Sequence, residues 1–130
     1  MSAERVRAWV SKAENDLLSA DNNLASVRVP YDVVCYHSQQ AAEKCLKGLV
    51  VHLGVQPIRT HDLLALLQEA RKFLTNSIPE GVENSCIVLN PYAVEVRYPD
   101  DDVQPTVQDA NEAREAAEVV YRWVLDCMAA

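Results

Sequence analysis

The sequence contains few glycines and no closely spaced cysteines. Only three of its 130 residues are glycine and six are proline. So few glycines argue against an all-β protein, whose many short strands are joined by glycine-rich turns. The four cysteines are too far apart for a CxxC motif, which excludes a zinc ribbon and a thioredoxin-type redox site. We therefore expect reduced thiols and a reducing, cytoplasmic location.

Positive charge is also scarce, because 12 basic residues stand against 19 acidic ones and the formal net charge is -7. Non-specific nucleic-acid binding depends on Lys and Arg releasing counterions from phosphates, so it is not expected across this surface. A local basic stripe for a nucleotide or short RNA stays open, as does a basic protein partner. No signal peptide is expected, and no uncharged stretch is long enough to cross a membrane.

What the sequence does contain is apolar residues at helical spacing. Steps of three and four residues recur in five segments, at about 4–25, 31–53, 61–74, 80–98 and 104–128. No segment shows sustained alternation of apolar and polar residues, which would indicate a strand. Long helices with short connections imply antiparallel neighbours. We predict an all-α, up-and-down bundle in one domain that spans residues 1–130.

Local signals refine these helices. The second segment has a broad apolar face, which predicts contact with two neighbouring helices in the middle of the bundle. Thr60 is the expected N-cap of the third segment. Pro91 removes an amide donor and must kink or restart the fourth segment. Thr106 and Asp109 resemble a capping box at the start of the fifth segment.

The second helix also carries a polar stripe, which consists of His37, Gln40, Lys44 and Lys47. These four positions fall on one side of a helix, opposite the broad apolar face. Two lysines one turn apart, with a glutamine and a histidine, are able to hold a phosphate or the edge of a nucleotide. The alternative is an ordinary solvated face, in which Glu43 and Lys47 form an i,i+4 ion pair.

Two further candidates lie outside that helix. His61 is expected at a helix N-terminus, where backbone amides bind anions, or else is an exposed histidine near a cap. Arg97 stands beside Tyr98 and an acidic loop, where it contacts a partner or forms a structural salt bridge. No metal site or cofactor is expected, because three adjacent aspartates at 100–102 do not converge on one ion and no known metal or phosphate motif is present.

Three segments carry a family resemblance. Residues 36–49, YHSQQAAEKCLKGL, resemble the signature second helix of HEPN domains, the higher-eukaryote and prokaryote nucleotide-binding family. Residues 60–67, THDLLALL, are similar to the start of the family's next helix. Residues 96–100, VRYPD, resemble its Arg-Tyr-Pro element. The motifs occur in the family's order and the resemblance covers nearly the whole chain.

The resemblance implies a bundle of four long helices with a short additional helix, and commonly a homodimer. Many prokaryotic members act beside a small nucleotidyltransferase, often as a toxin–antitoxin pair, while others are ribonucleases. The ribonuclease branch carries an Arg followed four to six residues later by a His. No arginine of this sequence has a histidine at that spacing. The resemblance therefore does not extend to RNA cleavage of the usual family type.

The leading prediction is a non-catalytic module that binds a nucleotide, partners a small nucleotidyltransferase, or does both. Its predicted binding residues are listed here: Gln40, Lys44, Lys47, His61, Arg97 and His37. The alternatives are a toxin-type ribonuclease that uses His61 or His37 with Arg97, and a purely structural, oligomerising bundle.

Overall fold

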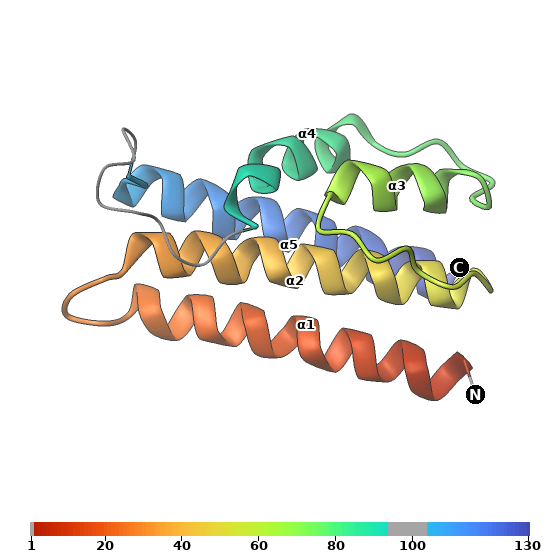
Figure 1. Ribbon diagram of the computed structural model, residues 1–130, viewed down its shortest axis with the longest axis horizontal. Coiled ribbons are helices and arrows are strands. Elements are labelled where there is room, and N and C mark those ends of the chain that lie inside the picture. Colours follow the sequence, from red (N-terminus) through yellow and green to blue (C-terminus); the bar gives the residue numbers. More distant parts are fainter. Residues whose placement is uncertain (1, 94–103) are drawn as a thin grey trace.

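One helix, α2 (Tyr31–His52), contacts every other helical element of the computed structural model, which describes residues 2–93 and 104–130. Its two long neighbours are α1 (Ser2–Leu24), which runs antiparallel beside it, and α5 (Val107–Ala129) (Figure 1). The short helices α3 (Leu63–Arg71) and α4 (Glu80–Leu89) cover the side of α2 and α5 that α1 leaves open. The prediction that α2 occupies the middle of the bundle is confirmed.

The predicted all-α class is also confirmed, and no strand forms within residues 2–93 and 104–130. Three helices are long, with 23, 22 and 23 residues, whereas α3 and α4 have 9 and 10 residues. The helix expected over 80–98 ends at Leu89, and a 3-10 turn, η1 (Asn90–Tyr92), follows. Pro91 lies in that turn, as expected for a residue without an amide donor.

The helix caps agree with the sequence at one position and differ at another. The capping box of Thr106 and Asp109 is present at the start of α5. The predicted N-cap Thr60 is wrong, because Asp62 caps α3 by accepting from the amides of Leu64 and Ala65 at 3.0 and 3.4 Å. The Thr60 hydroxyl instead accepts from the Asp62 amide at 3.0 Å. α3 therefore begins later than expected, and His61 lies in the segment before it.

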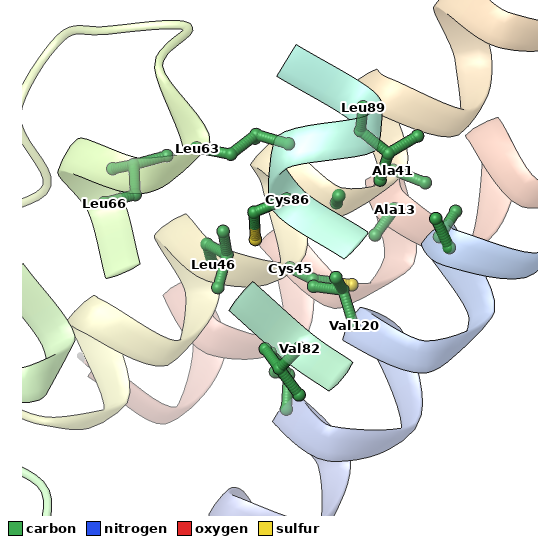
Figure 2. Packing of buried hydrophobic residues seen from close by; sticks show 14 of the residues in the cluster. Ala13, Ala41, Cys45, Leu46, Leu63, Leu66, Val82, Cys86, Leu89 and Val120 are labelled. Atoms are coloured by element: carbon green, nitrogen blue, oxygen red, sulfur yellow. The ribbon is translucent and has the colours of Figure 1, made fainter. Parts of the chain in front are cut away.

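The core combines large leucines with small residues where helices approach closely. Leu46, Leu66 and Leu89 are fully buried, as are Ala13 and Ala41 (Figure 2). Cys35, Cys45 and Cys86 are buried, whereas Cys127 is partly exposed. Burial raises the pKa of the Cys45 and Cys86 thiols to about 12. Both therefore stay protonated and act as small apolar groups of the core.

Helix α1 makes polar side-chain contacts with both α5 and α2. On the α5 edge, the Arg114 guanidinium donates from Nε and Nη2 to the two carboxylate oxygens of Asp21, at 2.8 and 3.1 Å. The Tyr121 hydroxyl donates to Glu14 on the same edge. On the α2 edge, Asp16 accepts from two α2 side chains. Polar contacts on two sides thus supplement the apolar stripe of α1.

At Gly48, a side chain of α1 packs closely against the backbone of α2. A Cβ atom at Gly48 would lie 3.1 Å from the Cβ of Trp9, which is tighter than ordinary contact. A Cβ at Gly81, in the first turn of α4, would meet nothing within 4 Å. The backbone at Gly48 is helical and its φ is not positive, so backbone conformation does not call for glycine there. The close contact with Trp9 is the reason that glycine suits this position.

We expect Gly48→Leu to destabilise the protein by about 1–3 kcal/mol, because the added side chain forces α1 and α2 apart. Gly81→Leu is the matched control and should leave stability unchanged or raise it by about 0.5–1 kcal/mol, since it removes a helical glycine at an open position. Urea unfolding followed by circular dichroism measures both changes. Equal effects of the two substitutions would contradict this account of the helix contact.

Candidate functional site

The polar stripe of α2 does not face open solvent. The Lys47 side chain is 13% exposed. The whole Gln40 residue is 9% exposed. One side of the stripe is bordered by α1, whose Asp16 contacts His37 and Lys44. The other side is bordered by the segment between α2 and α3, which runs back along α2 (Figure 1). The stripe is therefore the floor of a half-buried polar surface.

Glu43 is the centre of the first of two hydrogen-bonded clusters, which we term the Glu43 network. Its carboxylate is 5% exposed and accepts from Lys47 Nζ at 3.0 Å and from His61 Nδ1 at 2.9 Å. The side-chain amides of Gln39 and Gln40 donate to the same carboxylate at 3.4 Å each. Sequence analysis gave the i,i+4 ion pair of Glu43 and Lys47 as part of the alternative, an ordinary solvated face. The pair is present, but it is largely buried.

The Glu43 carboxylate stays ionised because of these partners. Burial alone raises its pKa, but the hydrogen bonds from His61 and Lys47 and the charge of Lys47 outweigh burial and lower the pKa below its usual value. An ionised carboxylate has no proton to donate, so Nδ1 of His61 must carry the hydrogen of the bond between them. The network thus fixes which nitrogen of His61 faces Glu43.

Hydrogen bonds also fix the backbone around His61. Gln39 Nε2 donates to the His61 carbonyl oxygen at 3.1 Å. Asn90 in η1 accepts from the Leu63 amide at 2.8 Å and donates to the Asp62 carboxylate at 2.9 Å. The segment that carries His61 is therefore pinned to α2 at one end and to η1 at the other.

The imidazole of His61 nevertheless faces solvent. Its side chain is 72% exposed, and its hydrogen bonds to the residues that the structure describes use Nδ1 and leave Nε2 open. The expected role of helix-terminal amides at His61 needs correction, because α3 begins at Leu63 and its first free amides already donate to Asp62. The accessible group at this position is the Nε2 atom.

A second cluster, the Asp16 network, joins α1 to the polar stripe. The Asp16 carboxylate accepts from His37 Nδ1 at 2.8 Å and from Lys44 Nζ. Although it is a charged residue, Asp16 is only 7% exposed. Both networks share one design, in which a buried carboxylate on a helix orients one histidine and one lysine. Among the residues that the structure describes, no hydrogen bond uses Nε2 of either histidine, and each lysine has further ammonium hydrogens for another molecule.

Of the six predicted site residues, five take part in these two networks. His37 and Lys44 belong to the Asp16 network, and Gln40, Lys47 and His61 to the Glu43 network. Arg97 lies outside the described residues, as do Tyr98 and the aspartates at 100–102. Sequence analysis did not single out Asp16, Gln39 or Glu43 as site residues. The sequence feature that could have identified them is the presence of polar residues within largely apolar helix faces.

Other features of the described chain lie apart from the networks. A hollow of about 500 Å³ is lined by residues such as Leu53, Phe73 and Trp123 and shares no residue with either network. Within residues 2–93 and 104–130, no group of three or more His, Cys, Asp and Glu side chains is arranged to hold a metal ion. No helix of the described part combines the length and apolar character needed to span a membrane.

The lowered pKa of Glu43 predicts how stability depends on pH. The folded pKa lies below the unfolded one, so ionised Glu43 stabilises the fold above pH 4.5 and this contribution is lost as the pH falls through the folded pKa. We expect Glu43→Gln to cost about 1–3 kcal/mol at neutral pH, because it breaks the pair with Lys47 and His61. The difference from wild type should shrink as the pH falls below 4.5 and through the lowered folded pKa of Glu43, where the carboxylate itself becomes protonated.

Urea unfolding at several pH values measures this difference. Glu83→Gln is the control, because the Glu83 pair with Arg71 is about half exposed on both sides and such surface pairs contribute about 0–1 kcal/mol. A cost of Glu43→Gln that does not decrease as the pH falls from 7 to far below 4.5 would contradict the role given to the Glu43 charge.

Comparison with known proteins identifies the family. The model of the HEPN domain matches residues 6–127. Among solved structures, TT1696 from Thermus thermophilus shares 31% identity, with 95% of this chain and 98% of that chain covered and a TM-score of 0.81. ST0689, an archaeal HEPN homologue, shares 30% identity, with 95% and 97% covered and a TM-score of 0.72. A comparison with curated proteins found no match. The chain therefore belongs to the HEPN family.

Proposed function

We propose that this HEPN domain is a non-catalytic module that binds the phosphate groups of a nucleotide with the polar stripe of α2 and with His61. The observation that carries this proposal is the pairing of each stripe lysine with a buried carboxylate. Lys44 is held by Asp16 and Lys47 by Glu43, so neither ammonium moves freely in solvent. Side chains that are already ordered lose less conformational entropy when a ligand binds.

The paired lysines keep hydrogen-bonding capacity for a ligand. An ammonium group has three N–H donors, and each stripe lysine uses one of them on its carboxylate. Across the two networks, the charges of the two carboxylates balance those of the two lysines. The two carboxylates therefore add no net negative charge that would repel an anion at the lysines. A small phosphate ligand is thus compatible with a chain whose net charge is -7.

The roles with partner proteins stay predictions at this point. The family resemblance favours a homodimer and a small nucleotidyltransferase partner in a toxin–antitoxin pair. Stable co-purification with a nucleotidyltransferase encoded nearby would support the partnership. A partner that binds at the α2 surface would also compete with the phosphate ligand, which links the two proposals.

A second candidate function, RNA cleavage, is favoured by one observation, the contact between Glu43 and the exposed His61. A carboxylate that accepts from Nδ1 holds the imidazole ready for proton transfer at Nε2. In such a reaction Nε2 takes the proton of a ribose 2′-hydroxyl while the 2′-oxygen attacks the adjacent phosphorus. The bond to the 5′-oxygen breaks, that oxygen gains a proton, and a 2′,3′-cyclic phosphate forms.

The first proposal is tested by thermal denaturation with ATP, GTP and pyrophosphate. A ligand at about 100 times its dissociation constant adds about 2.7 kcal/mol of stability, which raises the Tm by several degrees. We expect this shift in the wild type and a much smaller one in Lys44→Gln and Lys47→Gln. Lys72→Gln is the control, because Lys72 is an exposed lysine paired with Glu69 outside the networks. A shift of the same size in all variants would contradict the proposed site.

The second candidate is tested with a short RNA and its 2′-deoxy analogue. If cleavage occurs, the deoxy analogue should stay intact, and His61→Ala should lower the rate by about 100-fold or more, as loss of a general base does. His52→Ala is the control, because His52 belongs to neither network and lines a separate hollow. Cleavage that survives His61→Ala, or that His52→Ala removes equally, would exclude His61 as the base.

A further inference from the structure

A hollow of about 380 Å³ lies along α1, and one of its lining residues, Trp9, lies beside Lys47 of the candidate site. Four α1 side chains line it, namely Arg5, Ala8, Trp9 and Lys12. The Trp9 residue is partly exposed, and its Cβ packs over Gly48 of α2. An indole that borders an open hollow offers a flat, apolar surface to a planar ligand.

Lys47 connects this hollow to the Glu43 network. Its Nζ atom lies 5.7 Å from the centre of the Trp9 ring and 3.0 Å from the Glu43 carboxylate, which also holds His61. A ligand whose charged group reaches Lys47 therefore has the Trp9 indole within one side-chain length. The geometry suits a molecule with an anionic end and an aromatic end.

The charges around the hollow also favour an anionic ligand. Its lining contains two cationic side chains, Arg5 and Lys12, and no carboxylate. Arg5 is held against the segment between α2 and α3, because its Nη2 donates to Gln56 Oε1 at 3.2 Å. By contrast, α5 carries a surplus of acidic residues, and the whole chain has a net charge of -7. The two cationic side chains beside Trp9 thus form a local basic surface on an otherwise acidic protein.

We propose that Trp9 is a stacking platform for the base of the bound nucleotide, next to Lys47 of the phosphate site. This inference rests on the proposed function and assigns to the ligand an aromatic base as well as phosphate groups. Stacking on an aromatic side chain tolerates different bases, and the larger ring system of a purine offers more contact than a pyrimidine. AMP should therefore bind more tightly than UMP, and both more tightly than ribose 5-phosphate.

The two tryptophans of the chain make a direct test available. In Trp123→Phe, fluorescence reports on Trp9 alone, and in Trp9→Phe it reports on Trp123, which lines the separate hollow of about 500 Å³. We expect AMP to quench the fluorescence of Trp123→Phe with saturation, and to leave that of Trp9→Phe unchanged. Ribose 5-phosphate should quench neither, since it lacks a base.

Affinities separate stacking from a merely structural role. We expect Trp9→Leu to weaken AMP binding by about 5- to 150-fold, the range found when a stacked aromatic side chain is removed. Trp9→Phe keeps an aromatic ring and should weaken it less, while ribose 5-phosphate should bind all three proteins equally. Calorimetric titration gives these constants, and circular dichroism verifies that each variant is folded.

The outcomes keep the two proposals apart. If AMP stabilises the protein but Trp9 is not quenched and Trp9→Leu binds AMP like the wild type, the stacking platform is wrong and the phosphate site stands. Quenching of Trp123 instead of Trp9 places the ligand in the other hollow and also overturns the inference. If neither AMP nor ribose 5-phosphate nor pyrophosphate binds the folded wild type, the proposed function itself fails.

Discussion

A carboxylate in the interior of a helix bundle is stable only when other groups replace the water it has lost. Glu43 meets this requirement with four side-chain donors, of which His61 comes from a different part of the chain. The need to satisfy Glu43 thus draws the segment before α3 onto α2. The position of His61, the burial of Gln39 and the orientation of Lys47 all depend on this one charge.

The central helix consequently combines two environments. One side of α2 contributes apolar residues such as Leu46 and Leu49 to the core, and the other carries the polar stripe. Buried ion pairs seldom stabilise a fold better than apolar residues of similar size would. A helix with two such pairs at neighbouring turns therefore suggests selection for a surface with fixed charges, in line with a phosphate site on a HEPN domain.

Helical spacing was sufficient to predict the helices, the central position of α2 and the shared side of His37, Gln40, Lys44 and Lys47. It was not sufficient for the partners of these residues. The pair of Lys44 with Asp16 joins positions 28 residues apart, and local periodicity carries no information on such contacts. Asp16 stands at the border of the apolar stripe of α1, where a carboxylate is able to turn either way. Similarly, helical spacing did not predict whether Thr60 or Asp62 would accept hydrogen bonds from the first amides of α3, and this choice sets where the helix begins.

The contacts along both edges of α1 have a mechanical consequence. A helix held only by an apolar stripe is able to roll about its own axis at modest cost, since leucines and alanines exchange neighbours easily. The bonds of Asp21 and Glu14 to α5 oppose rolling in one sense, and those of Asp16 to α2 oppose it in the other. The rotation of α1 about its axis is therefore fixed. The direction in which the Trp9 indole points is set by charges that lie about one to three turns away from it along the helix.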